Sequence, residues 1–351
     1  MKLYFKKILI RFSITIICFS SIFSQCIGDL NDDYSVNIQD VIIIVNTILN
    51  NDEVNYEIAD INNDQNVNIQ DVIGIINIIL FEDNPCTSQI NITYNIHESL
   101  PEDWIIEFYI IIDNLISIIP ANQNNFNNLN VYAWNSSVQD PYLGIEGGTY
   151  IGGGDEGFIM VLEINEMEFE WNHMHRLSVI AHEYFHVYQL SINEPMNEPN
   201  GQYNPNGFSI KWLIEGTATS FESLYVQDYY NYNYFNNDLV HTELSPLIHT
   251  DPSVFESYSS NNIDDNYTSS VFMVLVLVKE LINQGFTEYE AFRMIFKEFM
   301  QTGAKNSDWE IYFLDMFGFS VDDFYNVLQS YPLNLDGVFP SSLLSIEEIF
   351  N

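Results

Sequence analysis

Apolar residues recur at helical spacing in two short stretches near the start of the chain, 41–49 and 72–80. Each stretch predicts an amphipathic helix, because positions three and four apart share one face of a helix. Further along, short apolar runs predict strands, and one longer amphipathic stretch predicts a helix. The strands are expected at 90–96, 129–134 and 158–164, and the helix at 101–119.

Two helices are expected at 177–190 and 210–226, and the chain beyond Glu215 is expected to be mostly helical. Apolar residues recur at spacings of three and four over 177–190, and Pro195 ends the helix that they predict. The run 271–278 is too short to cross a bilayer and predicts a buried helical segment. The fold class is therefore α+β, with strands followed by a helical C-terminal part. Helices are predicted at 177–190, 210–226, 269–284, 288–301, 309–316 and 321–328.

Two histidines in the helix predicted over 177–190 have the spacing of a metal site. His182 and His186 are four residues apart, so both imidazoles lie on one face. Glu183 completes the form H-E-x-x-H, in which the carboxylate lies close to a metal-bound water. Glu215, in the first half of the next helix, supplies a third ligand. Two histidines and one carboxylate predict an open, catalytic zinc site.

The segment around Glu215 has the form W-x-x-E-G-x-A, with Gly216 and Ala218 beside the carboxylate. Small residues there are expected to allow a close approach of the helix backbone to the metal. Both motifs together resemble those of the gluzincin metallopeptidases, with close matches confined to 182–190 and 212–218. The resemblance implies a zincin-like catalytic domain over residues 87–351, with a mixed sheet, an active-site helix and a helical C-terminal subdomain.

The gluzincin resemblance also implies a role for each motif residue. His182, His186 and Glu215 would bind one zinc ion, and Glu183 would be the general base for peptide hydrolysis. The family's aminopeptidase segment G-x-M-E-N is absent, which favours cleavage inside chains. Relatives often carry an acidic partner for a histidine ligand where this chain has Thr219, and Glu222 is the alternative.

A second electrophile is expected to stabilise the oxyanion beside zinc. Spacing does not choose among the downstream candidates, whereas the two histidines before the motif, His173 and His175, are expected at the surface. The candidates are Tyr258, Tyr267, His241 and His249.

An internal repeat precedes this region: residues 29–50 and 60–81 are identical at 14 of 22 aligned positions. Each copy places oxygen donors at loop positions 1, 3, 5, 7, 9 and 12, a pattern that suits Ca²⁺. The first set is Asp29, Asn31, Asp33, Ser35 (by its carbonyl), Asn37 and Asp40, and the second is Asp60, Asn62, Asp64, Asn66 (by its carbonyl), Asn68 and Asp71.

The repeat resembles a dockerin, whose paired half-EF-hands also carry Asp at position 12. The resemblance implies a small all-α calcium-binding module over residues 26–86 with two Ca²⁺ ions. Position 6 is Tyr34 or Gln65 instead of glycine, and a residue with a Cβ in that sharp turn should weaken affinity. The module either docks a cohesin-like scaffold or surface partner or only stabilises the N-terminal part of the protein.

Residues 1–25 have the form of a signal peptide, with basic residues around an apolar stretch from Ile8 to Phe23. The protein is therefore expected to be secreted or displayed at the cell surface. Cys26 and Cys86 would remain after cleavage and predict one disulfide around the repeat, the alternative being two unrelated thiols. A lipid anchor at Cys26 is the less favoured alternative, because Gln25 is a poor match to a lipobox.

Charge excludes one class of partner. The whole chain has a net charge of −39, and beyond residue 25 six Lys and Arg stand against 49 Asp and Glu, a net of about −43. Nucleic acid is therefore not expected as a partner, because its phosphates would be repelled.

The glycine-rich run 144–157 has no phosphate-loop ending and does not predict a nucleotide site. By resemblance, the strand at 158–164 would form the rim of the cleft and pair with an extended substrate, with the glycines as a mobile rim. A plain surface loop is the alternative. For the whole protein, the alternative to a peptidase is a non-enzymatic, calcium-dependent surface or scaffold protein with a degenerate peptidase fold.

Overall fold

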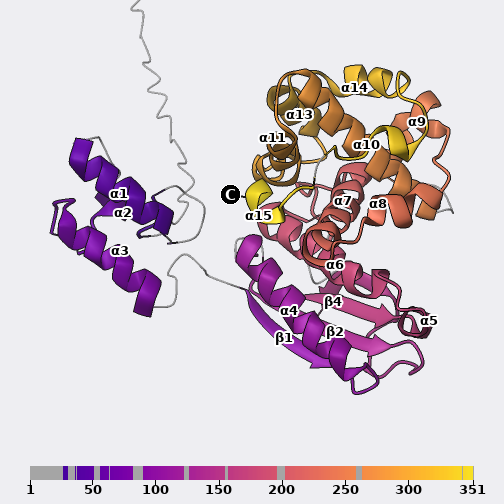
Figure 1. The fold of residues 1–351 in the computed structure, drawn as a ribbon, viewed down its shortest axis with the longest axis horizontal. Helices are drawn as coiled ribbons and strands as arrows, with labels where there is room; N and C mark the ends of the chain where they lie inside the picture. Colours follow the sequence, from indigo (N-terminus) through magenta and orange to yellow (C-terminus); the bar gives the residue numbers. More distant parts are fainter. Residues whose placement is uncertain are drawn as a thin grey trace, which may run out of the picture. The chain divides into compact units, whose positions relative to one another are not determined.

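The chain divides into two compact units, residues 1–87 and 88–351, and each is described here by itself (Figure 1). The computed structural model describes part of the chain in each unit. It describes residues 27–30, 36, 38–50, 56–62, 64–81, 90–121, 126–154, 157–195, 202–257, 263–341 and 343–350.

The N-terminal unit is helical in its described part. It consists of α1 (Ile38–Asn50), the short α2 (Tyr56–Ala59) and α3 (Ile69–Phe81), which confirms the two helices predicted from the repeat. α1 and α3 pack through equivalent positions of the two copies, since Ile44 and Ile75 are both fully buried. Cys26 and Cys86 lie outside the described residues, and so does the expected signal peptide.

The C-terminal unit begins with a small mixed sheet, so the α+β class is confirmed. Its order is β1-β2-β4-β3; β1, β2 and β4 run parallel, and β3 runs antiparallel to β4. The three strands predicted from the sequence are all present. The strands are β1 (Asn91–Ile96), β2 (Asn128–Asn135), β3 (Thr149–Gly154) and β4 (Gly157–Ile164).

The strand β3 corrects two expectations about the glycine-rich run. Half of the described part of this run is neither a mobile rim nor a plain loop, because residues 149–154 form the edge strand. β4 is paired on both sides, by β2 and by β3, so its backbone groups cannot pair with a substrate. The run's last glycine, Gly157, has φ +141°, and a Cβ there would lie 2.4 Å from the carbonyl oxygen of Asn128.

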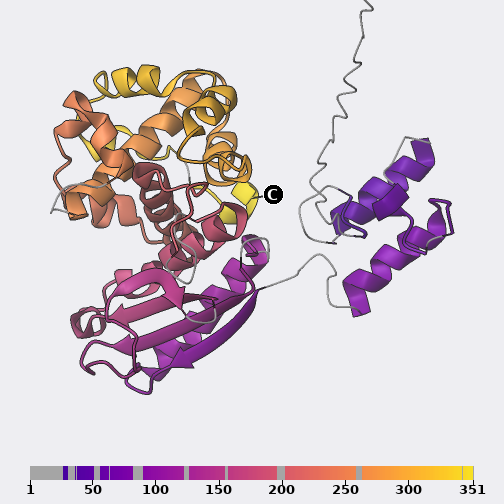
Figure 2. The same cartoon turned by 180° about the vertical axis from the view of Figure 1, so that it is seen from behind.

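The sheet and the helices that follow form one hydrophobic core. α4 (Glu102–Ile118) packs with one face of the sheet, and α6 (His175–Ile192) contacts both this helix and the strands β3 and β4 (Figure 2). The other face of the sheet carries Trp134, Ile159 and Val161, with tyrosines of the 142–150 segment packed on it.

The helical part confirms the predicted helices, although the one expected at 288–301 contains a π-helical segment. In α10 (Ile263–Asn283), residues 271–278 are all buried, as predicted. No helix in the described ranges has the length and apolar content needed to cross a bilayer. The elements are α5 (Glu166–Glu170), α7 (Lys211–Tyr230), α8 (Tyr234–Asn237), η1 (Leu239–His241), α9 (Leu247–Thr250), η2 (Pro252–Glu256), α10 (Ile263–Asn283), α11 (Glu288–Arg293), the π-helix η3 (Met294–Glu298), α12 (Phe299–Gln301), α13 (Trp309–Phe317), α14 (Val321–Leu328), η4 (Leu335–Gly337) and α15 (Ile346–Phe350).

α7 is the central helix of this part and packs against both α6 and α10. Gly216 explains the close approach to α10, because a Cβ at this position would lie 2.6 Å from the carbonyl oxygen of Ser270. The expectation that Gly216 serves the approach to the metal is therefore wrong. The absence of a side chain at Gly216 allows α10 to pack closely against α7.

Candidate metal centre

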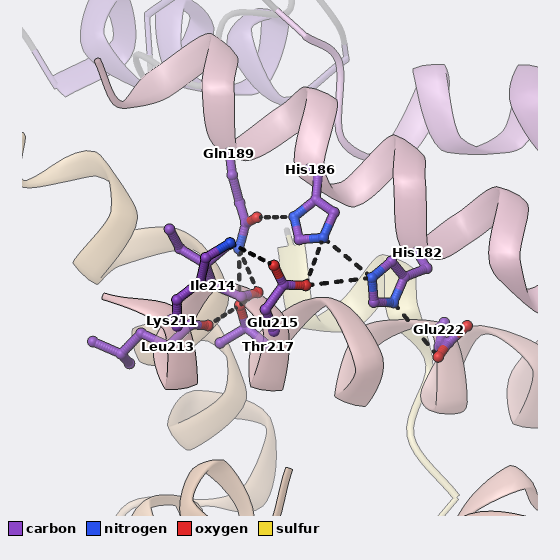
Figure 3. A network of polar contacts seen from close by, with 9 residues as sticks. All are labelled: His182, His186, Gln189, Lys211, Leu213, Ile214, Glu215, Thr217 and Glu222. Carbon is purple, nitrogen blue, oxygen red and sulfur yellow. Dashed lines mark hydrogen bonds and ion pairs between the residues drawn. The ribbon is translucent and has the colours of Figure 1, made fainter. Parts of the chain in front are cut away.

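Two adjacent helices bring the three predicted ligands together. α6 presents His182 and His186 from consecutive turns, and α7 presents Glu215 beside them (Figure 3). All three side chains are largely buried; Glu215, for example, is 6% exposed. α6 itself is buried on most of its circumference, so its orientation is fixed by the core and not by the site alone.

The ligand atoms have the mutual spacing of a tetrahedral metal site. Nε2 of His186 lies 3.1 Å from Nε2 of His182 and 3.1 Å from Oε2 of Glu215. Nε2 of His182 lies 3.7 Å from the same oxygen. Ligands about 2.0–2.1 Å from a tetrahedral Zn²⁺ are separated by about 3.3 Å. His182, His186 and Glu215 therefore form a group that could hold a metal ion.

The electrostatics of the group also favour a cation. Burial lowers the pKa of His182, but the nearby carboxylates of Glu215 and Glu222 outweigh it and hold this pKa well above its usual value. Burial raises the pKa of Glu215, yet the two imidazoles and Lys211 hold it well below its usual value. A field that favours a proton on His182 equally favours a metal ion in its place.

Lys211 sets the orientation of the carboxylate ligand. Its Nζ lies 3.1 Å from Oε1 of Glu215, one helical turn away on α7. Oε2, the other oxygen, is the one that faces both imidazoles. The arrangement suits a carboxylate that gives one oxygen to a metal and the other to an ammonium group.

Glu183 combines burial with an unsatisfied oxygen. The residue is 5% exposed, and its Oε2 has no hydrogen-bond partner among the described residues. Burial raises the pKa of its carboxyl, an effect that Glu215 and Glu222 reinforce and that the two imidazoles oppose. A buried carboxylate with a free oxygen beside a ligand set is suited to exchange a proton with a bound water.

Nδ1, the imidazole nitrogen that faces away from the ligand group, has a different partner in each histidine. Nδ1 of His182 lies 3.6 Å from Oε1 of Glu222. Glu222 is thus the acidic partner of a histidine ligand that the sequence suggested in place of Thr219. The hydroxyl of Thr219 is buried without a partner in the described part of the chain. Nδ1 of His186 lies 2.7 Å from Oε1 of Gln189, a residue that the sequence had not singled out. Its position one turn beyond the second histidine was the available signal.

The candidates for the second electrophile differ in their distance from the ligand group. The ring of Tyr267 lies beside His182, with centroids 6.2 Å apart. Nε2 of His249 lies 2.9 Å from the carbonyl oxygen of Tyr331, His241 is exposed, and Tyr258 is outside the described residues.

The histidines that precede the motif take no part in the ligand group. His173 lies 3.2 Å from Asp238, and His175 lies 3.0 Å from Glu168. Both are contacts between an imidazole and a carboxylate near the start of α6. His173 is exposed, as expected, whereas His175 is half-buried, and neither belongs to the candidate ligand group.

In the second loop of the repeat, two aspartate side chains accept hydrogen bonds from the backbone of the loop. Asp60 accepts hydrogen bonds from the backbone N–H groups of Asp64 and Gln65, and Asp71 accepts from those of Asn62 and Asn68. Gln65 has φ +67°, the left-handed conformation expected at loop position 6. Asn66 and Asn68 line the same turn, joined by the hydrogen bond from Asn68 Nδ2 to the carbonyl oxygen of Asn66.

The first loop is described only in part. Asp29 and Asp40 are both buried, and Oδ1 of Asp40 accepts from the backbone N–H of Leu30 at 2.7 Å. The other expected donors, Asn31, Asp33, Ser35 and Asn37, lie outside the described residues.

Comparison with protein-family models gives no match for this chain, and comparison with curated proteins gives none either. The chemistry of the site therefore rests on its own geometry.

Proposed function

We propose that the protein is a secreted, zinc-dependent metallopeptidase of the gluzincin type that cleaves within peptide chains. The observation that carries the proposal is the convergence of two imidazole nitrogens and one carboxylate oxygen at 3.1–3.7 Å, with the unsatisfied carboxylate of Glu183 beside them. Two histidines and a single carboxylate leave a coordination position open, which is the donor set of a catalytic site.

The residues of the site have distinct roles in this proposal. His182, His186 and Oε2 of Glu215 would hold zinc, which would supply Lewis acidity when bound. Glu183 removes a proton from the attacking water and later delivers it to the leaving amine. The burial that raises the pKa of Glu183 makes it a stronger base and a better proton carrier.

Tyr267 is the candidate we favour for oxyanion stabilisation. Of Tyr267, His241 and His249, it is the one whose ring lies beside a ligand. A phenol donates a hydrogen bond without needing a charge, which suits a developing oxyanion. We therefore expect Tyr267→Phe to lower kcat more than it changes KM.

An extended substrate would pair with β3, and not with β4 as the sequence suggested. β3 is at the edge of the sheet, beyond β4, and contacts α6, the helix that carries both histidines. An edge strand presents unpaired backbone groups that can pair with an extended peptide. Three glycines at 152–154 leave that backbone little covered by side chains.

The N-terminal unit is proposed to bind two Ca²⁺ ions and to tether the enzyme to a cohesin-like partner. Exposed isoleucines occupy equivalent positions in the two copies: Ile38 is 64% and Ile69 63% exposed, and Ile42 is 55% and Ile73 52% exposed. Apolar side chains that stay exposed on both helices favour docking over a purely stabilising role.

Substrate profiling of proteome-derived peptides with and without a zinc chelator tests the proposed activity. Chelator-sensitive cleavage at internal bonds is expected, and release of single terminal residues would instead indicate an exopeptidase. The alternative is a non-enzymatic, calcium-dependent surface protein with a degenerate peptidase fold. That alternative predicts no cleavage and less than one zinc per chain in the purified protein.

A further inference from the structure

A buried glutamine joins the two helices that carry the metal ligands. Gln189 lies on α6, one turn beyond His186, and is 6% exposed. Its amide makes three hydrogen bonds: Oε1 to Nδ1 of His186 at 2.7 Å, and Nε2 to the carbonyl oxygen of Ile214 at 3.2 Å and to Oγ1 of Thr217 at 2.9 Å (Figure 3). These last two partners lie on α7, on either side of Glu215.

The partners of Gln189 fix which way its amide points. The carbonyl of Ile214 is only an acceptor, so it must face the amide nitrogen. Oγ1 of Thr217 donates its one proton to the carbonyl oxygen of Leu213 at 2.5 Å, so it too must accept from Gln189. The opposite amide orientation would place an acceptor against both groups, and the geometry excludes it.

The amide in turn fixes the tautomer of His186. Oε1 of Gln189 cannot donate a hydrogen bond, so Nδ1 of His186 must carry the proton. The lone pair of the neutral ring is then on Nε2, the atom that lies 3.1 Å from both other ligand atoms. A chain of hydrogen bonds, whose direction is set by the acceptor-only carbonyl of Ile214, thus extends from the backbone of α7 to the imidazole on α6.

We propose that Gln189 is a positioning residue that holds His186 in the metal-binding tautomer and keeps α6 and α7 in register at the ligand set. The consequence for zinc rests on the proposed function, but the tautomer assignment does not. The two histidines differ in this respect, because the far nitrogen of His182 faces the carboxylate of Glu222. A neutral amide orients the imidazole without adding a further negative charge to the site.

Zinc affinity measured by competition with a chromophoric chelator tests the first half of the proposal. Gln189→Leu is expected to weaken zinc binding about 10–100-fold, the usual effect of removing such a partner. Gln284→Leu is the matched control, because Gln284 also bonds to a backbone carbonyl, that of Phe317, but has no contact with the ligand residues. Unchanged zinc affinity in Gln189→Leu would overturn the proposal and leave the proposed function intact.

The tautomer is measured directly in the metal-free protein, by ¹⁵N NMR of histidine-labelled samples. His186 is identified as the signal lost in His186→Gln, in spectra recorded at about pH 9. Wild type should carry a proton on Nδ1 of His186 even though the Glu215 carboxylate lies 3.1 Å from Nε2, and Gln189→Leu should shift that proton towards Nε2. This result stands even if the protein binds no zinc, an outcome that would refute only the proposed function.

A conservative variant keeps the test decisive if Gln189→Leu does not fold. Gln189→Glu retains an acceptor for His186 but sets a carboxylate oxygen against the carbonyl of Ile214. We expect it to keep the Nδ1–H tautomer and to unfold at a lower temperature than wild type. An Nε2–H tautomer in wild type or in Gln189→Glu would contradict the proposal.

Discussion

Oε2 of Glu215 lies 3.1 Å from Nε2 of His186, although the two residues are 29 positions apart in the sequence. The contact joins neighbouring helices whose packing is set elsewhere: α6 by the sheet core and α7 by α10. The ligand geometry therefore depends on residues that never approach the metal position, and Gly216 is the clearest of these.

Gly216→Ala should destabilise the protein even though alanine is the better helix former. The helix propensity gain is about 1 kcal/mol, but a Cβ placed 2.6 Å from the carbonyl oxygen of Ser270 forces α7 and α10 apart. We expect a net loss of about 1–2 kcal/mol in unfolding free energy and weaker zinc binding, measured by denaturant titration and chelator competition. Gly337→Ala, which meets nothing within 4 Å, should change neither.

Zinc binding near pH 7 should release a proton from His182. In the metal-free protein Glu215 and Glu222 hold its pKa well above 6.5 against the effect of burial, so the ring is protonated there and must lose that proton to bind metal. Apparent zinc affinity should rise with pH through the raised pKa and then level off. Calorimetry in two buffers of different ionisation enthalpy counts the protons released. Glu222→Gln lowers the pKa of His182 and should reduce that count; equal counts would contradict this account.

Gln65→Gly should strengthen calcium binding at the second loop. Gln65 has φ +67°, where a residue with a Cβ is disfavoured by about 1–2 kcal/mol and glycine is not. Part of that strain is expected to appear as tighter binding, about three- to tenfold by titration calorimetry of the full chain. Gln65→Ala keeps the Cβ and should show no gain, so an equal gain in both variants would rule out backbone strain as the cause.

Stability should fall at alkaline pH because two partly buried tyrosines keep their protons in the folded state. Burial, helped by nearby acidic groups, raises the pKa of Tyr94 and of Tyr229 to about 12. The unfolded chain loses these protons from about pH 10, so unfolding becomes more favourable between about pH 10 and 12. Denaturant midpoints measured from pH 8 to 11 should decline above pH 10, and more gently in Tyr94→Phe. A midpoint independent of pH would contradict the effect.

The sequence predicted the elements that carry the ligands better than it predicted their surroundings. The spacing of His182 and His186 and the apolar periodicity around them depend only on helix geometry, and the structure confirms both helices. Local periodicity also identified β1, β2 and β4.

Features decided by tertiary contacts were missed. Residues 149–154 lack the apolar alternation of a strand, and they form β3 only because β4 offers them a partner edge. Gln189 and Lys211 are ordinary polar residues in a helical sequence until α6 and α7 meet. The role of Gly216 likewise depends on α10, a helix more than 40 residues away in the chain.

The rate of peptide hydrolysis by Glu183→Gln at full zinc occupancy tests the central claim most directly. Glutamine keeps the size of the side chain and removes its ability to take a proton, and Glu183 is not among the three ligands. The account predicts that this variant retains about one zinc per chain, as wild type does, and loses hydrolysis by several orders of magnitude. A zinc-loaded Glu183→Gln protein that cleaves at the wild-type rate would contradict it.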